Sequence, residues 1–247
     1  FREYELTGDV KKRQESEYWK SIEFSLFHKV AVSYYPSYVE EEAIHAVDET
    51  IPVKAITAYV YEEFLQNLNK DFAKREGLLF VGGFAHPPNA DAVLWFAKEV
   101  FPKIREQIKV NFYIVGSKVT DEIKALEQPG NGIIVKGFVS EEELADLYRN
   151  CRIVVVPLRY GAGVKGKVVE AIYNGAPIVT TSVGSEGIPD VEKVLLVKDQ
   201  PDEFAETVVE LYKDEKRLED LAEKTQVYIR EHFSIDAAWD VIKEDFE

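Results

Sequence analysis

The chain has 247 residues, 46% of them hydrophobic, which is enough for one large core or two modest ones. Its 45 acidic residues outnumber its 30 basic ones and give a formal net charge of -15. Because nucleic acids are bound through clustered lysine and arginine, this balance argues against a nucleic-acid partner. Any phosphate-binding site must therefore be local.

The residue content also bears on the compartment. The single cysteine, Cys151, cannot form an internal disulfide and is assigned to the core, and no Asn-x-Ser/Thr site is present. Both features predict a cytoplasmic protein. The apolar runs are of strand length, which excludes a spanning helix but leaves an interfacial membrane contact open. Because the sequence begins with Phe1 and contains no methionine, we expect a fragment of a longer polypeptide.

The first 58 residues are predicted to alternate between α and β structure. Residues 1–14 are polar and charged and are expected to be a frayed end or a trimmed linker. Apolar residues at three- and four-residue spacing then predict an amphipathic helix. This region is too small to be a stable domain alone. The predicted elements are a helix at 15–29, a strand at 30–33, a helix at 38–47 and a strand at 53–57.

From residue 77 onward, apolar runs of strand length alternate with helical segments. Such runs are typical of strands buried on both faces, so we predict a Rossmann-like parallel sheet with helices on both faces. Ser140 with Glu143 forms a capping box for one helix, and Pro201 opens another. The six predicted strands are LLFV, NFYIV, GIIV, CRIVVV, PIVTT and VLLV.

The stretch 157–181 joins a buried strand, a glycine-rich loop, a helix and a second strand. Gly161 and Gly163 lack Cβ atoms, so backbone there can approach a ligand closely. The helix is expected to run from Val164 to near residue 175, and its free N–H groups and dipole favour a phosphate. Lys165 and Lys167 lie in its first turn, where they oppose the dipole. This conflict with local stability indicates a function.

Glu170 lies three residues after Lys167, on the same helical face. Its carboxylate oxygens can accept both hydrogens of a vicinal diol such as ribose. A purely structural interpretation stays open, in which the glycines make a tight connection. In that case Lys167 and Glu170 form a solvated pair contributing about 0.2–0.5 kcal/mol.

Gly82 and Gly83 follow the first strand of the predicted sheet. Ligands of open α/β sheets bind at the carboxyl ends of strands, so these glycines are expected to converge with the 161–170 loop. The absence of a full Gly-x-Gly-x-x-Gly argues against a nicotinamide or flavin cofactor. Asn89 is predicted to be the N-cap of the next helix. No spacing typical of metal ligands is found, so no metal is expected.

The whole stretch 157–181 resembles the nucleotide-sugar loop of retaining glycosyltransferases of the GT-B fold, family four, and the resemblance extends from about Leu78 onward. It implies that Glu170 holds the ribose of the donor and that Val139 contacts the base through its backbone. The family's first loop glutamate is replaced by Ala162, and no Arg and Lys clamp follows the first strand. The residues implied for the donor are Gly82, Gly83, Val139, Gly161, Gly163, Lys165, Lys167 and Glu170.

The same resemblance implies a division of the chain. Residues 1–58 would be a remnant of the N-terminal acceptor-side domain, 59–76 the interdomain link, and 77–247 the C-terminal nucleotide-sugar-binding domain. The last helix would cross back to the N-terminal domain, although packing on the C-terminal domain is an open alternative. Its predicted buried stripe is Phe233, Trp239, Ile242 and Phe246.

The implied reaction is transfer of a hexose from a nucleotide-diphosphate sugar to a glycan or lipid-linked acceptor, with retention and without metal or other cofactor. No catalytic residue is assigned. A peripheral membrane contact would involve the missing part of the N-terminal domain. A nucleotide-sugar-binding module without turnover and a GT-B-like epimerase stay open as alternatives. Because transfer needs both reacting groups in contact, these 247 residues are expected to bind donor but transfer sugar negligibly.

Overall fold

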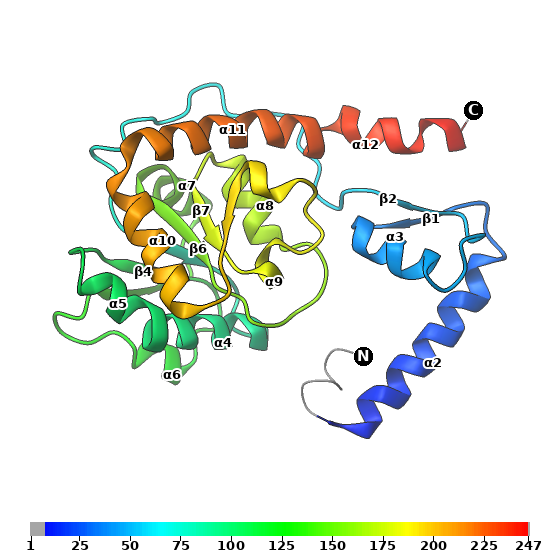
Figure 1. The fold of residues 1–247 in the computed structure, drawn as a ribbon, viewed down its shortest axis with the longest axis horizontal. Helices are drawn as coiled ribbons and strands as arrows, with labels where there is room; N and C mark the ends of the chain where they lie inside the picture. The colour runs from blue at the N-terminus through cyan, green and yellow to red at the C-terminus, as the bar shows by residue number, and fades with distance from the viewer. Residues whose placement is uncertain (1–7, 247) are drawn as a thin grey trace.

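A computed structural model describes residues 8–246 (Figure 1). Its larger body is a six-stranded, wholly parallel sheet with strand order β5-β4-β3-β6-β7-β8. Each of the six predicted apolar runs forms one of these strands, so the predicted fold class is confirmed. The strands are β3 (Leu78–Val81), β4 (Phe112–Val115), β5 (Ile133–Gly137), β6 (Ile153–Val156), β7 (Ile178–Thr180) and β8 (Leu195–Val197).

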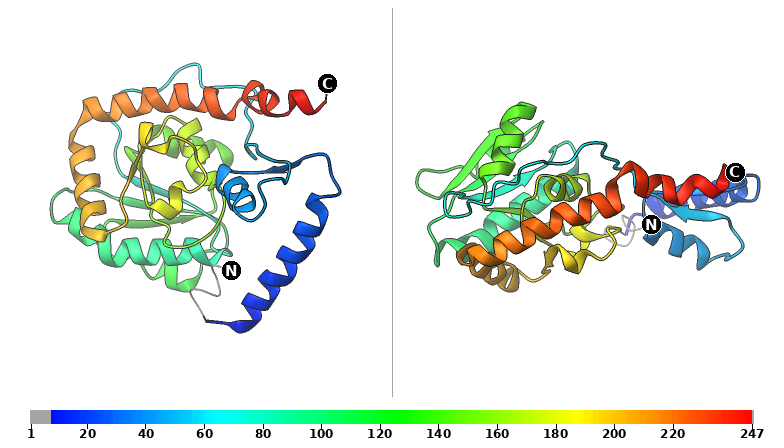
Figure 2. Two further views of the ribbon diagram at one scale, coloured as in Figure 1. Left: turned by 45° about the vertical axis from the view of Figure 1, so that its right-hand side comes forward. Right: turned by 90° about the horizontal axis from the view of Figure 1, so that it is seen from above.

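Helices cover both faces of this sheet (Figures 1 and 2). On one face α8 packs on α11, and on the other η1 and α5 pack on α10. Phe80, Phe96 and Phe204 are fully buried between these layers. The helices are α4 (Pro87–Trp95), the π-helix η1 (Phe96–Val100), α5 (Phe101–Arg105), α6 (Asp121–Lys124), α7 (Glu141–Asn150), α8 (Gly166–Tyr173), α9 (Ser182–Ser185), η2 (Val191–Lys193), α10 (Pro201–Lys213), α11 (Glu215–Phe233), α12 (Ile235–Ile242) and η3 (Lys243–Asp245).

Several predicted helix starts agree with the structure. The Ser140 hydroxyl accepts from the Glu143 backbone N–H at 3.2 Å, and α10 begins at Pro201. Helix α8 begins at Gly166, two residues later than predicted, because Lys165 has the extended backbone of an N-cap.

A smaller N-terminal unit comprises α2 (Val10–Phe27), β1 (Ser33–Tyr35), α3 (Tyr38–His45) and β2 (Val53–Ala55). Strands β1 and β2 pair in parallel over a small core of Phe27, Ile44, Ile51 and Val53. The predicted frayed end is wrong for residues 10–14, which open α2 because Asp9 accepts from the Lys11 backbone N–H; residues 1–7 of that end lie outside the described part. The first strand begins three residues later than the predicted start, since residues 28–31 form turns and a bend.

Residues 59–76 cross from the N-terminal unit to the sheet along α11. Within the described chain, this segment contains no helix or strand apart from one bridge between Tyr61 and Ser234. The Tyr61 backbone N–H donates to the Phe233 carbonyl at 2.8 Å. This hydrogen bond therefore attaches the segment to the end of α11.

The C-terminal segment crosses back to the N-terminal unit, as predicted (Figure 2). Asp245 accepts hydrogen bonds from Tyr34 Oη at 2.6 Å and from Lys54 Nζ at 2.8 Å. The predicted buried stripe is wrong in part: Phe233 is buried, but Trp239 is 51% exposed and Phe246 is 71% exposed. Polar contacts at the chain end therefore contribute to this connection. Over residues 8–246, we find no helix with the length and apolar character that crossing a bilayer requires.

Candidate functional site

The strand order reverses between β3 and β6, which are hydrogen-bonded neighbours. The chain therefore leaves their carboxyl ends in two loops: the first glycine loop, Gly82 and Gly83, and the second glycine loop, Gly161 to Gly163. A Cβ atom at Gly82 would lie 2.9 Å from Lys167 Nζ, and one at Gly161 would lie 4.0 Å from Pro88 Cβ. The predicted convergence of the two loops is confirmed, at the place where open α/β sheets bind ligands.

Lys167 lies where the two loops meet. Its Nζ donates a hydrogen bond to Asn89 Oδ1 and lies 5.0 Å from the centroid of the Phe80 ring. Burial, and then the charge of Lys165, lower the pKa of Lys167 to about 8. Within residues 8–246, Lys167 forms no ion pair with a carboxylate. A half-buried cation without a counter-charge is an arrangement that an anionic ligand would complete.

Asn89 joins the two loops, and its predicted role as a helix N-cap is wrong. His86 is the N-cap of α4, because the two prolines that follow it fit the first helical positions. Asn89 is buried in the first turn, where Nδ2 donates to the Gly83 carbonyl at 2.7 Å and Oδ1 accepts from Lys167. The sequence signal for this contact is limited to an asparagine near the start of a helix.

Lys165 extends in a different direction from Lys167. Its Nζ donates to the Gly163 carbonyl and lies 3.7 Å from Glu186 Oε2. Both side chains are largely buried, with 10% and 14% of their surface exposed. Glu186 belongs to the SVGSEG loop that follows β7, and sequence reasoning did not single it out. The two lysines therefore contact different loops.

Glu170 is surrounded by tyrosines from three segments: Tyr61 of the link, Tyr148 of α7 and Tyr173 of its own helix. The Tyr61 and Tyr173 rings stack with centroids 4.1 Å apart. Burial raises the pKa of Glu170, and the nearby Tyr148 hydroxyl acts in the opposite direction. In the part of the chain that is described, no ion pair joins Glu170 to Lys167, so the interpretation as a solvated pair is wrong.

Val139 follows β5 at the edge of the sheet, with β4 between that strand and β3. Gly137 turns the chain with a φ of 71°, after which Phe138 is 81% exposed and Val139 packs against the core. Val139 is thus at the carboxyl end of the sheet but away from the Lys167 cluster. Its role as a base contact stays a prediction.

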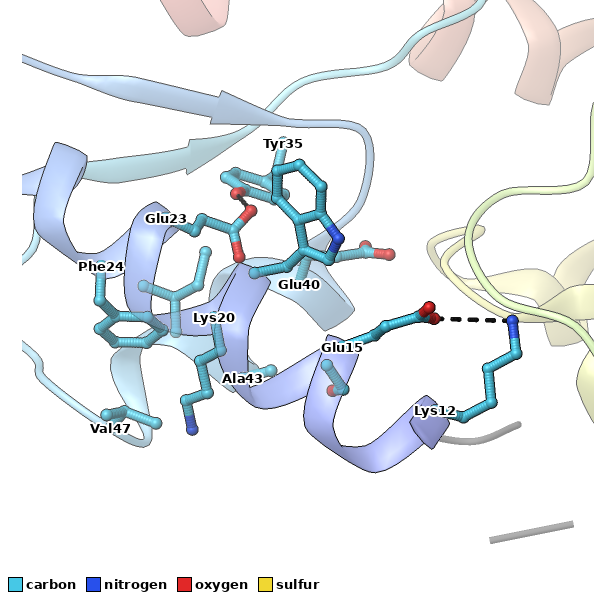
Figure 3. A pocket seen from close by; sticks show the side chains of 12 residues that line it. Lys12, Glu15, Lys20, Glu23, Phe24, Tyr35, Glu40, Ala43 and Val47 are labelled. Carbon is cyan, nitrogen blue, oxygen red and sulfur yellow. Dashed lines mark hydrogen bonds and ion pairs between the residues drawn. The ribbon is translucent and has the colours of Figure 1, made fainter. Parts of the chain in front are cut away.

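The N-terminal unit and the link border the second glycine loop. A Cβ atom at Gly163 would lie 3.9 Å from Glu40 Oε1 of α3, and one at Gly166 would lie 2.6 Å from Tyr59 Oη. Glu40 also lines a cavity of about 530 Å³ between α2 and α3, together with Glu23 and Tyr35 (Figure 3). The region that borders the second glycine loop is therefore polar and aromatic.

Across the described residues, no group of three or more histidine, cysteine, aspartate or glutamate side chains is placed to hold a metal ion.

Comparison with known proteins finds a matching protein family. The sequence model described as "Glycosyl transferases group 1" matches residues 75–214. An uncharacterized 44.6 kDa protein in the cps region of Klebsiella pneumoniae is 29% identical over 184 residues, a match that covers 71% of this chain and 45% of that protein. The chain thus spans about half the length of this curated relative.

Solved structures of GT-B glycosyltransferases share the fold. A mutant of S. aureus TarM, in complex with fondaparinux, alpha-GlcNAc-glycerol and UDP, matches with a TM-score of 0.72 at 14% identity, over 90% of this chain and 45% of TarM. Anabaena HepE, in complex with UDP and glucose, matches with a TM-score of 0.66 at 15% identity, over 90% of this chain and 64% of HepE. At such low identity these matches show the fold alone.

Proposed function

Because the chain belongs to the glycosyl transferases group 1 family, we propose that it binds a nucleotide-diphosphate sugar as the donor side of a hexosyltransferase. The proposed acceptor is a glycan or a lipid-linked acceptor. The cytoplasm is the expected location. Since the chain covers 45% of its Klebsiella pneumoniae relative, the transfer reaction belongs to the proposal for the complete protein.

The observation that carries this proposal is the environment of Lys167. A cation in a half-buried position, held by a neutral amide and an aromatic ring, lacks the counter-charge that buried charges normally have. A diphosphate supplies that charge. The N-terminus of α8 adds free N–H groups and the positive end of the helix dipole on the same loop.

The rest of the donor is assigned from the family resemblance of the sequence. Glu170 accepts hydrogen bonds from the ribose hydroxyls, and the turn at Val139 contacts the base through its backbone. Uracil is the first base to test, because UDP is the nucleotide named with both TarM and HepE.

The proposed reaction retains anomeric configuration and needs no metal ion. When the glycosidic bond breaks, negative charge grows on the departing diphosphate. Lys167 and the N–H groups of α8 are placed to stabilise this charge, which is the task that a divalent cation performs elsewhere. Retention is proposed from the family resemblance of the loop.

Calorimetric titration with UDP and uridine tests the donor site. Lys167→Ala should weaken binding of UDP by about one to two decades, since charge-assisted hydrogen bonds contribute roughly 1.5–3 kcal/mol. Uridine binding should be unchanged. Lys213→Ala, on the exposed end of α10, is the matched control and should leave both affinities unchanged. Equal losses for UDP and uridine would contradict the diphosphate assignment.

A further inference from the structure

Asn89 is a buried amide that uses both ends of its side chain at the loop junction. It is 6% exposed, its Nδ2 donates to the Gly83 carbonyl at 2.7 Å, and its Oδ1 accepts from Lys167 Nζ. Asn89 and Lys167 are 78 positions apart in the sequence, on α4 and α8. The Asn89 side chain therefore connects the Gly83 carbonyl of the first glycine loop to Lys167 in the first turn of α8.

Space beside the contact between Asn89 and Lys167 exists because Gly82 has no side chain. A Cβ atom at Gly82 would lie 2.9 Å from Lys167 Nζ and 3.0 Å from Asn89 Cγ, so any larger residue would displace both groups. The backbone of Gly82 does not adopt a positive φ. Glycine at this position is thus explained by close approach rather than by backbone conformation.

The hydrogen bonds of the ammonium group can be counted. An ammonium group has three N–H donors, of which Asn89 receives one. The Phe80 ring lies beside it at 5.0 Å and accepts no conventional hydrogen bond. Donors of Lys167 are therefore left for an anion.

Charged groups near the contact do not neutralise it. Lys165, on the same helix, has the same sign as Lys167, and it lies 3.7 Å from Glu186. Arg159, which precedes the second glycine loop, pairs with Asp91 of α4 through two hydrogen bonds. The carboxylate nearest in sequence to Asn89 is thus already engaged.

We propose that Asn89 is a positioning residue for the donor: its neutral amide aims the Lys167 ammonium into the space left by Gly82 without compensating its charge, so that the diphosphate supplies the counter-charge. A carboxylate at this position would hold the lysine equally well but would neutralise it. The proposal rests on the proposed function, since it names how that donor site is kept ready for an anion.

Asn89→Asp tests the proposal because it places a negative charge beside Lys167. It also replaces the Nδ2 donor to the Gly83 carbonyl by an oxygen, so it should melt somewhat earlier than wild type. The variant should bind UDP at least tenfold more weakly than wild type and bind uridine equally well. Wild-type affinity for UDP should fall as the pH rises above about 8, where free Lys167 loses its proton. In Asn89→Asp the added anion stabilises the ammonium, so this decline should move to higher pH.

Two further variants complete the test. Asn89→Ala removes the amide without adding charge, so UDP affinity should fall several-fold while the decline with pH stays near 8. Asn131→Asp is the matched control: Asn131 Nδ2 donates to the Leu126 carbonyl at 2.7 Å and Oδ1 accepts from the Ile133 N–H at 3.0 Å, next to β5. It should leave UDP affinity unchanged.

The outcomes separate the two proposals. If wild type binds UDP and Asn89→Asp binds it within twofold, the positioning role is overturned while the donor site stands. If both Asn89 variants lose UDP and uridine together, Asn89 only supports the fold and the inference is again overturned. If wild type binds no nucleoside diphosphate, the proposed function fails and this inference fails with it.

Discussion

At the scale of single residues, Lys167 shows how function and stability oppose each other. Its pKa in the folded chain is about 8, below the value of 10.5 of a free lysine, because burial disfavours the charged form. Between these values the unfolded chain binds more protons than the folded one. The free energy of unfolding should therefore rise with pH across this window, and the burial cost is fully present below pH 8.

Lys167→Met should remove this dependence. The difference in unfolding free energy between wild type and variant should change by roughly 1–3 kcal/mol from about pH 8 to about pH 10.5, in favour of wild type. Urea denaturation at several pH values measures it. Parallel profiles for the two proteins would mean that Lys167 is better solvated than its position indicates.

Glu170 allows a test specific to ribose. In wild type, UDP should bind more tightly than 2′-deoxy-UDP, because in the proposed site the carboxylate accepts from both ribose hydroxyls. Glu170→Gln should weaken UDP binding by about one to two decades and reduce this preference. Since burial raises the pKa of Glu170, its charge is destabilising at neutral pH, and the variant should be at least as stable as wild type.

The control for this test is Glu206→Gln, an exposed change on α10. It should leave both affinities and the preference for ribose unchanged. If Glu170→Gln keeps the full preference for UDP over its deoxy form, another group holds the ribose.

At the scale of elements, a buried arginine fixes the link to the sheet domain. Arg75 is 3% exposed and donates to three backbone carbonyls, those of Asn69, Tyr148 and Cys151. Burial lowers the pKa of Arg75 to about 10, so it stays charged at neutral pH. The link is thereby attached to the end of α7, next to the tyrosine that neighbours Glu170.

Arg75→Ala should therefore be costly. It removes the Arg75 donors from three backbone carbonyls, two of them at buried contacts, and creates a cavity, so we expect a loss of about 3–5 kcal/mol in unfolding free energy. Arg149→Ala is the control, because that side chain is 60% exposed and pairs only with Asp146. It should change stability by less than about 1 kcal/mol. Chemical denaturation of both variants decides, and similar effects would show that the Arg75 contacts add little.

At the scale of the whole molecule, the two bodies differ greatly in core size. The N-terminal unit buries four hydrophobic residues, whereas the sheet domain has a continuous core across all six strands. Amides of the N-terminal unit should therefore exchange with solvent faster than those of the central sheet. Asp245→Ala removes the acceptor of Tyr34 and Lys54, so exchange over residues 33–55 should become faster still. Hydrogen exchange read by mass spectrometry tests this, and exchange unchanged from wild type would contradict the role of Asp245.

Much of the fold was predictable because its signals are local. Apolar runs of strand length, a serine cap at Ser140 and a proline at the start of α10 each depend on neighbouring residues only, and the structure confirms them. Local signals misplaced the start of α2, which begins at Val10 after the Asp9 cap. They also predicted a buried stripe on α12, although Trp239 remains half-exposed.

The sequence by itself determined that two glycine loops follow parallel strands and that lysines and a glutamate accompany one of them. Only the tertiary structure decided which side chains meet: Lys167 with Asn89, Lys165 with Glu186, and Glu170 with tyrosines from three segments. The reason is the strand order. Because it reverses between β3 and β6, it brings together residues 78 positions apart, and no local pattern of hydrophobicity or capping encodes that distance.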